Sequence, residues 1–231
     1  VECVEEEGQS WAVTTTLKAP GRHLNYRDPE DFKPTFFQRW GELIGQIHAL
    51  AAQYTGGKAI NSWVEEHALF STWCADEAVG EKWRQLGDHL RTLPTPPDAF
   101  GLIHNDPHVD NMLVDDGQLT MLDFDVCDHH WFMTDIGIAL FHPFWEQRHA
   151  APRVRLAVAE MMATNFMEGY QRAYTLPGGW LGRLHTFLKY RQILFFIALG
   201  HEGVMNDWAK YTVRDLREAI VNDIPVTEFT F

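Results

Sequence analysis

One short stretch of the sequence carries three side chains that could together hold a metal ion and handle a proton. Asn111 follows Asp106 after five residues, and Asp123 follows Asn111 after twelve. Acidic groups that converge repel one another unless a cation lies among them, and oxygen ligands of this kind suit a hard ion such as Mg²⁺. We therefore expect a magnesium site at Asn111 and Asp123, with Asp106 beside it.

The segment between Asn111 and Asp123 has the pattern of a β-hairpin. Two apolar segments, 112–114 and 119–122, flank Asp116-Gly117, a pair typical of two-residue turns with positive φ. Hairpin strands lie about 4.8 Å apart, so residues at the open end meet. This pairing predicts that Asn111 lies opposite the residue immediately before Asp123.

The distribution of charge indicates the same need for a cation. From residue 92 to residue 147 there is no Lys or Arg, whereas ten acidic residues, including Asp125, fall in this stretch. Arginines from elsewhere in the chain could still fold over it.

These residues carry a resemblance to a known family. His104-x-Asp106, then Asn111, then Asp123-Phe-Asp125 resemble the catalytic and metal-binding loops of the aminoglycoside phosphotransferase and choline kinase family. The resemblance implies a protein-kinase-like fold and an ATP-dependent or GTP-dependent phosphotransferase that modifies a hydroxyl of a small molecule. It implies that Asp106 is the catalytic base and that Asn111 and Asp123 hold Mg²⁺. His104 would anchor the loop.

Two positions depart from the commonest form of the family motif. They are Asn105 and Pro107, and we expect neither side chain to take part in the chemistry.

The same resemblance divides the chain near residue 22. Residues 1–22 would be the end of an amino-terminal lobe, and residues 23–231 the helical carboxyl-terminal lobe that carries both loops. The nucleotide-binding hinge would be approximated by Thr16, Leu17, Lys18 and Ala19. An edge strand followed by an ordinary turn remains open for this region.

Such a kinase also needs a glycine-rich lid and a Lys from its amino-terminal lobe, and neither occurs in the sequence. We therefore expect the rest of that lobe in a longer parent chain, and residues 1–231 alone to be nearly inactive.

Apolar residues at helical spacing predict a mainly α fold with a small β-hairpin, as in the carboxyl-terminal lobe of a protein-kinase-like protein. Helices are expected over residues 34–54, 63–91, 152–174, 180–199 and 206–221, with another that Thr134 or Asp135 caps. A strand is expected over residues 11–17. His48 is expected in or near the core, and His129 and His130 at the pocket wall or the surface.

Composition limits the classes of partner. A net charge of -13 argues against nucleic acid, because phosphate backbones need stripes of Lys and Arg. Three widely spaced Cys without a Cys-x-x-Cys pair favour a reduced, cytoplasmic setting, and no apolar run reaches the ~18 residues that a membrane helix needs. An acidic surround at Asp128, Glu146 and Glu202 favours a cationic acceptor, such as an amino-alcohol, amino-sugar or aminoglycoside.

Two other functions remain open. A metal-dependent hydrolase could use His104, His108, Asp106 and Asp123 around a transition metal. A catalytically silent kinase-like binding module could retain only the scaffold.

Overall fold

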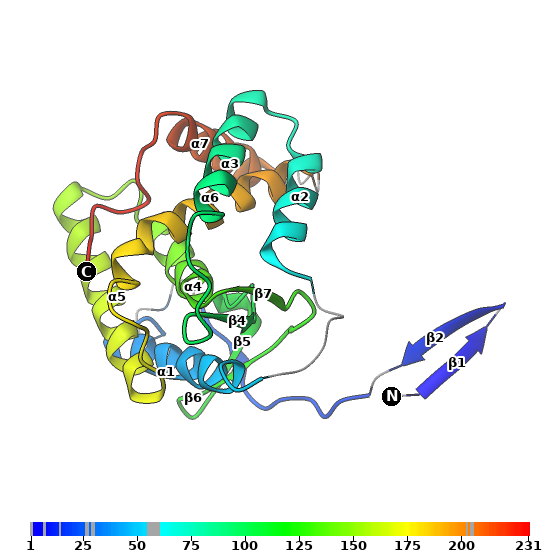
Figure 1. The fold of residues 1–231 in the computed structure, drawn as a ribbon. Coiled ribbons are helices and arrows are strands. Elements are labelled where there is room, and N and C mark those ends of the chain that lie inside the picture. The colour runs from blue at the N-terminus through cyan, green and yellow to red at the C-terminus, as the bar shows by residue number, and fades with distance from the viewer. Residues whose placement is uncertain are drawn as a thin grey trace.

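The computed structural model describes residues 2–6, 8–13, 15–25, 28, 31–54, 61–201, 203 and 206–231. Within these ranges the chain is mainly α, as expected (Figure 1). The helices are α1 (Pro34–Ala51), α2 (Trp63–Trp73), α3 (Glu77–Leu90), α4 (Phe132–Glu146), α5 (Pro152–Ala173), α6 (Leu184–His201) and α7 (Asp207–Val221). The strands are β1 (Glu2–Glu6), β2 (Gln9–Val13), β3 (Arg22–His23), β4 (Phe100–Ile103), β5 (Met112–Asp115), β6 (Gln118–Met121) and β7 (Asp128–Trp131).

Small antiparallel sheets interrupt the helices. β1 pairs with β2, β3 extends the sheet of β5 and β6, and β4 pairs with β7. The hairpin of β5 and β6 has the predicted register, with Asp115 opposite Gln118, and its turn residues Asp116 and Gly117 have φ of 44° and 76°. The hairpin prediction is confirmed.

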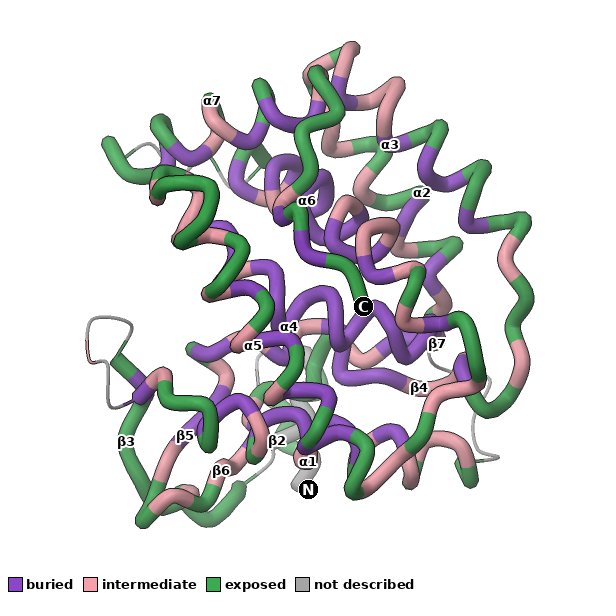
Figure 2. Tube along the Cα trace, turned by 90° about the vertical axis from the view of Figure 1, so that its left-hand side faces the viewer, coloured by how far each residue is buried: buried purple, intermediate pink, exposed green. Residues whose placement is uncertain are grey.

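The core forms around α4 and α6, which pack on each other in the middle of the molecule. α4 is buried on nearly every side, and so is most of α6 (Figure 2). Gly137 of α4 allows this close packing, because a Cβ at that position would lie 3.0 Å from the backbone of Phe187 on α6. Helices that are apolar all round are typical of a buried position.

α1 and α5 pack against each other along their length. A Cβ at Gly41 would lie 1.8 Å from the carbonyl oxygen of Phe166, and one at Gly169 would lie 1.7 Å from that of Gln38. The two backbones therefore touch where these glycines lie. Pro34 begins α1 in the first turn, where its missing N–H costs nothing.

Several boundaries differ from the sequence prediction. The expected helix over 63–91 is two helices, because Asp76 caps a new one by accepting a hydrogen bond from the backbone N–H of Val79 (3.1 Å). The expected strand over 11–17 ends at Val13, and residues 15–17 belong to neither a helix nor a strand. Trp131, not Thr134 or Asp135, precedes α4.

The two adjacent histidines lie on β7, and their surroundings also differ from the prediction. His130 is fully buried and lies in the core, so its expected place at the pocket wall or surface is wrong. The alternation of a strand sends one side chain inward, and β7 was not predicted because its sequence, Asp-His-His-Trp, lacks an apolar run.

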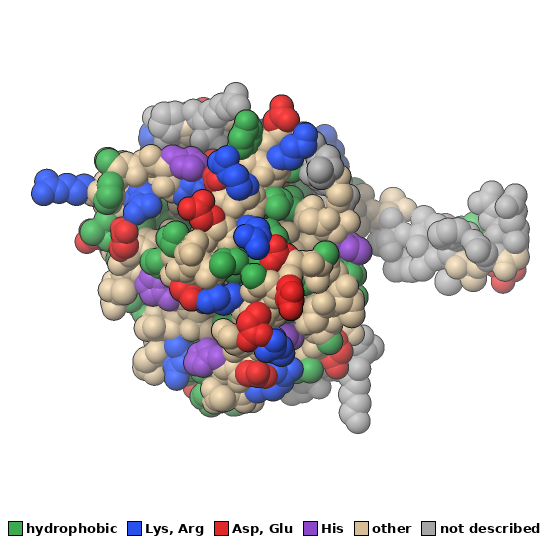
Figure 3. Space-filling view, turned by 90° about the horizontal axis from the view of Figure 1, so that it is seen from above, with side chains coloured by type: hydrophobic (Ala, Val, Ile, Leu, Met, Phe, Trp, Pro, Cys, Tyr) green, Lys and Arg blue, Asp and Glu red, His purple; other side chains and the backbone are tan. Residues whose placement is uncertain are grey.

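On the face that α3 and α7 form, acidic and basic side chains alternate (Figure 3). Arg217 of α7 binds Asp76 at 2.6 Å, and Asp223 is paired with Lys82 and Lys189. These pairs tie α3, α6 and α7 together at the surface. Over the described ranges, every helix is too short or too polar to cross a bilayer.

Candidate active site

The loop after β4 is held in place by a buried carboxylate. Asp135 on α4 accepts hydrogen bonds from the backbone N–H groups of His104 (3.0 Å) and Asn105 (2.8 Å). Its Oδ2 also lies 3.1 Å from Nε2 of His48 on α1, and Nδ1 of that ring lies 2.8 Å from the Tyr170 hydroxyl on α5. Three helices therefore support one loop, and Asp135 braces it.

His104 anchors the loop from inside, as the resemblance implied. Its ring is buried, with Nε2 2.8 Å from the carbonyl oxygen of Leu122 and Nδ1 accepting from the backbone N–H of Asp106 (3.2 Å). Both ring nitrogens are engaged within the loop and the hairpin. His104 is therefore not available as a ligand of the transition metal that a hydrolase would need.

Asp106 follows at the base of a cleft, with its carboxylate held by three side chains. Nη2 of Arg191 donates to Oδ1 at 2.8 Å, while Nδ2 of Asn111 and Nε2 of His108 each lie 3.2 Å from Oδ2. Burial alone would raise the pKa of Asp106, but the hydrogen bond from His108 and the positive charge of Arg191 outweigh it. They hold that pKa well below its usual range, so the carboxylate is ionised at neutral pH.

The hairpin brings Asn111 to this carboxylate. Asn111 donates from Nδ2 to the backbone carbonyl of Asp106 (2.9 Å) as well as to its side chain, so its Oδ1 remains free for another partner. The backbone N–H of Leu122 donates to the carbonyl of Asn111 (2.8 Å), which places Asp123 next in the chain, as predicted.

Asp123 and Asp125 lie together at the open end of the hairpin. The hydrogen bond to Asp123 and the negative charge of that residue raise the pKa of Asp125. Within the part of the chain that the structure describes, neither carboxylate forms an ion pair with Lys, Arg or His. Asp123 has a φ of 61°, which turns the chain sharply as it leaves the sheet.

The donor set fits a magnesium ion better than a softer metal. In the described ranges no three His, Cys, Asp or Glu side chains are grouped to hold a metal by themselves. An amide oxygen from Asn111 and a carboxylate from Asp123 are hard oxygen donors, and Mg²⁺ commonly takes one or two such ligands together with phosphate oxygens. These two residues would hold the ion with a bound nucleotide.

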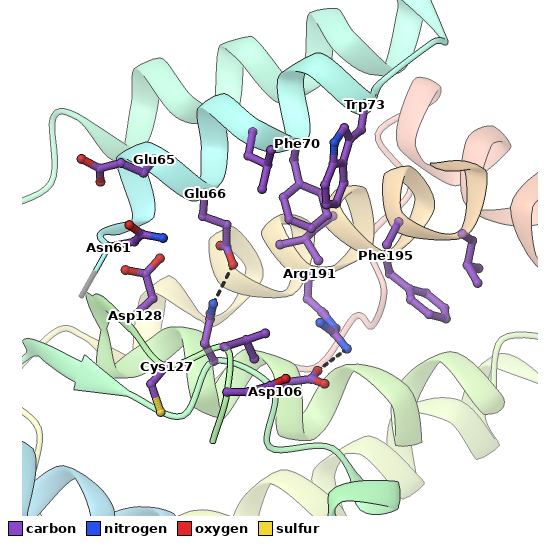
Figure 4. A pocket seen from close by; sticks show the side chains of 17 residues that line it. Asn61, Glu65, Glu66, Phe70, Trp73, Asp106, Cys127, Asp128, Arg191 and Phe195 are labelled. Atoms are coloured by element: carbon purple, nitrogen blue, oxygen red, sulfur yellow. Dashed lines mark hydrogen bonds and ion pairs between the residues drawn. The ribbon is translucent and has the colours of Figure 1, made fainter. Parts of the chain in front are cut away.

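A cleft of about 540 Å³ opens above Asp106, between α2, α6 and the loops that follow β4 and β6 (Figure 4). One wall is apolar and aromatic: it includes Leu69, Phe70, Trp73, Leu194, Phe195 and Leu199. Another part of the lining is acidic, with Glu65, Glu66, Asp125 and Asp128, and two of these stand on α2 beside the apolar residues of that helix. A pocket with both kinds of lining suits a small molecule with an apolar part and a positive charge.

Two of these carboxyl groups are altered by their burial. Glu66 accepts hydrogen bonds from the Tyr190 hydroxyl (2.5 Å) and from Nδ2 of Asn105 (2.6 Å), yet burial raises its pKa. Burial, together with the negative charge of Glu66, raises the pKa of Asp128 to about 7. The register of β4 and β7 places Asp128 opposite Ile103 and so beside the loop.

A second cleft, of about 740 Å³, lies on the other side of Arg191. Its polar lining comes from the catalytic loop and α4: His108, Asp110, His142, Glu146 and Gln147. Arg191 and Phe195 line both clefts and form the wall between them. The acidic residues expected from the sequence to surround the site therefore do not lie together. Asp128 lines the first cleft and Glu146 the second, and Glu202 lies outside the described residues.

The expected nucleotide hinge is not brought to either cleft. Thr16, Leu17 and Lys18 are exposed, Ala19 is half-buried, and none of them lines a described pocket. Leu17 is 98% exposed. The assignment of these four residues to nucleotide binding stays a prediction.

The structure adds site residues that the sequence interpretation missed. Asn105 was expected to take no part in the chemistry, and nothing in the sequence indicated that its side chain would bind Glu66 and line the cleft. Glu66 gave no signal among the other charges of α2. Arg191 gave little signal either, since it precedes the apolar run of α6 with Lys189 only two residues before it.

The fold and the site together define a protein of the protein-kinase-like class, in which a helical body carries the loop of Asp106 and the hairpin of β5 and β6. The family model of the phosphotransferase enzyme family matches residues 2–182, and the chain belongs to that family.

The chain is similar to several kinases of small molecules. It is 30% identical to an amicoumacin kinase of Bacillus subtilis (strain 168), over all of this chain and 70% of that protein. A solved amicoumacin kinase in complex with AMP-PNP, Ca²⁺ and Ami superposes with a TM-score of 0.80 at 26% identity, over 92% of this chain and 65% of that one. A microcompartment-associated aminopropanol kinase shares the fold, with a TM-score of 0.64 at 23% identity over 81% of this chain and 61% of its own length. The chain thus spans less than two thirds of these two solved proteins.

Proposed function

We propose that the protein transfers the γ-phosphoryl group of ATP or GTP to a hydroxyl of a small molecule, with Asp106 as the base. The observation that carries the proposal is the contact of Asn111 with Asp106, at 2.9 Å to the backbone and 3.2 Å to the carboxylate. It fixes a metal ligand and a proton acceptor in one rigid unit. In-line phosphoryl transfer depends mainly on such positioning.

Asn111 and Asp123 would hold Mg²⁺ on the nucleotide phosphates. When bound, the ion neutralises the charge of the phosphate oxygens. The role of this chain is to orient the acceptor: the ionised carboxylate of Asp106 accepts a hydrogen bond from the acceptor hydroxyl and receives its proton. Membership of the phosphotransferase family and the AMP-PNP and Ca²⁺ bound to the solved amicoumacin kinase support this assignment.

The acceptor that this cleft suits best carries a positive charge close to its hydroxyl. Glu66 and Asp128 line the cleft, neither forms an ion pair with a described Lys or Arg, and aromatic side chains line the same cleft. An amino-alcohol, amino-sugar or aminoglycoside has this combination of groups, and one similar kinase is named for aminopropanol. The three Cys without a paired motif favour a cytoplasmic setting.

The proposed reaction also needs a glycine-rich lid and a Lys over the phosphates. Neither occurs in residues 1–231, so we propose that these residues alone transfer phosphate much more slowly than a complete kinase.

The test is turnover by the full-length protein with Mg²⁺, ATP or GTP, and a panel of hydroxyl acceptors that differ in charge. We expect Asp106→Asn to lower kcat by roughly 10² to 10⁴ with little change in nucleotide affinity, because a general base contributes about that factor. Asp115→Asn is the control, since Asp115 is an exposed carboxylate at the turn end of the hairpin that follows the loop. Unchanged turnover in Asp106→Asn would eliminate the assigned base, and absence of turnover with every acceptor would favour a silent binding module.

A further inference from the structure

We propose that Arg191 is a positioning residue that fixes the carboxylate of Asp106 toward the acceptor hydroxyl. The inference rests on the proposed function and adds to it a residue from a distant helix. Asp106 lies in a stretch that contains no Lys or Arg, and among the described residues Arg191 is the one arginine or lysine within 4.0 Å of it. Nη2 of Arg191 donates to Oδ1 of Asp106 at 2.8 Å (Figure 4).

Arg191 is itself held firmly enough to orient a partner. The residue is 8% exposed, and its guanidinium lies 5.8 Å from the centre of the Phe195 ring. Its Nη2 also lies 3.2 Å from Nε2 of His142 on α4. Burial lowers the pKa of His142 well below its ordinary value, so the neutral ring can accept that hydrogen bond. The planar guanidinium thus has fixed contacts on α6, on α4 and on the catalytic loop.

The contacts of the carboxylate determine which oxygen remains open. Each carboxylate oxygen can accept about two hydrogen bonds. Oδ2 already has two neighbours that can donate, Asn111 and His108. Among the described residues Oδ1 has one, Arg191, so it retains a second acceptor position, and Asp106 lines the cleft. The acceptor hydroxyl therefore donates to Oδ1, and Arg191 sets the direction of that hydrogen bond.

The place of Arg191 in the fold links the base to the acceptor. It lines the cleft beside Asp106 and stands on α6, the helix that also supplies Leu194, Phe195 and Leu199 to the apolar wall. The same helix thus contacts the acceptor and holds the base that acts on it. With a neutral residue at position 191, Asn111 and His108 would still hold Oδ2, but Oδ1 would lose the contact that fixes its direction.

The experiment compares arginine variants in the full-length protein, with kcat, acceptor KM and nucleotide affinity measured separately. We expect Arg191→Ala to lower kcat by roughly 30-fold or more while nucleotide affinity changes less than threefold, because misplacement of a reacting group costs about 10²-fold in rate. Arg191→Lys restores the charge without the planar fork, so we expect it to recover only part of the loss. Free guanidinium ion added to Arg191→Ala should recover at least tenfold in kcat.

Arg183→Ala is the matched control. Arg183 also lies over an aromatic ring, that of Trp180 at 4.6 Å, but it binds a backbone carbonyl rather than the catalytic loop. We expect its kcat to stay within twofold of the wild type and not to respond to guanidinium. Circular dichroism and thermal unfolding verify that each variant is folded.

The outcomes separate this inference from the function on which it rests. If the wild type turns over and Asp106→Asn does not, the proposed function stands, and the arginine variants then decide the role of Arg191. A folded Arg191→Ala with wild-type kcat, or one whose lost activity does not respond to guanidinium, would overturn the positioning role. If the wild type shows no phosphotransfer, it is the proposed function that fails.

Discussion

Asp128 shows how the fold gives a single carboxyl group properties that its sequence position does not. The residue is 3% exposed, and one of its oxygens accepts a hydrogen bond from the backbone N–H of His129 (2.6 Å). Burial and the nearby charge of Glu66 raise its pKa to about 7, so near neutral pH it is charged only in part. An ammonium group in the cleft would favour the charged form, which is why we expect the acceptor to be cationic.

This pKa leads to a prediction for stability. The pKa of Asp128 is about 7 in the folded state, against an ordinary value of 3.8, so the folded chain binds more protons between these values. Asp128 in its neutral form therefore costs the folded state nothing, whereas its charged form destabilises the fold. The folded state has this advantage in full below pH 3.8 and loses it as the pH rises through about 7. Asp128→Asn has no such loss, so its stability relative to the wild type should increase by about 2 to 3 kcal/mol between pH 5 and pH 8. Urea unfolding at both pH values measures this, with the exposed Asp115→Asn as control; an equal difference at the two values would contradict it.

Some residues of the site could be predicted from the sequence, and others could not. Asp106, Asn111 and Asp123 could be found because they are close together along the chain, and one hairpin turn is enough to bring them together. Glu66 and Arg191 could not, since their roles depend on α2 and α6 folding over the loop from distant parts of the chain. Local spacing determines the first group, and tertiary packing determines the second.

Among the elements, those with one apolar face or a distinctive turn were predictable. The hairpin of β5 and β6 and the helices α1, α5, α6 and α7 lie close to their expected positions. At least 24 residues separate the paired residues of β4 and β7 along the chain, and both strands are stabilised by the core on which they lie. Their pairing therefore cannot be predicted from the sequence of either strand. The break between α2 and α3 depends on the cap at Asp76, which the apolar pattern does not reveal.

The contact between α1 and α5 gives a prediction at the scale of elements. Gly41→Ala places a methyl group within 1.8 Å of the Phe166 carbonyl oxygen, so the two helices must move apart. We expect a loss of roughly 1 to 3 kcal/mol in the free energy of unfolding, as for other overpacked positions. Because α1 and α5 also carry His48 and Tyr170, which support Asp135, turnover should fall as well. Gly182→Ala is the control, since a Cβ there has no atom within 4 Å, and denaturant unfolding compares the two. Equal stability of both variants would mean that the helices do not approach as closely as described.

At the scale of the whole molecule, the dominant property is the negative charge. The chain carries 32 acidic residues against 19 basic ones, a formal net charge of -13. On the face of α3 and α7 the two signs are interleaved, whereas in the cleft above Asp106 the acidic wall of Glu65, Glu66, Asp125 and Asp128 is accompanied by one cation, Arg191, which pairs with Asp106. Such a wall attracts a cationic acceptor before any contact forms, and salt screens that attraction over a distance of about 10 Å at 0.1 M.

The dependence of the acceptor KM on salt therefore tests the link between charge and function. For a cationic amino-alcohol acceptor, we expect the full-length protein to show a KM that rises by roughly 3- to 10-fold between 0.02 M and 0.3 M salt, because screening weakens each interaction with the acidic wall. A neutral alcohol of similar size is the control, and its KM should change by less than twofold over the same range. Asp128→Asn should reduce the salt dependence for the cationic acceptor and leave that for the neutral alcohol unchanged. If the two acceptors respond equally to salt, the acidic wall does not select for positive charge, and the acceptor is bound by its hydroxyl and apolar groups alone.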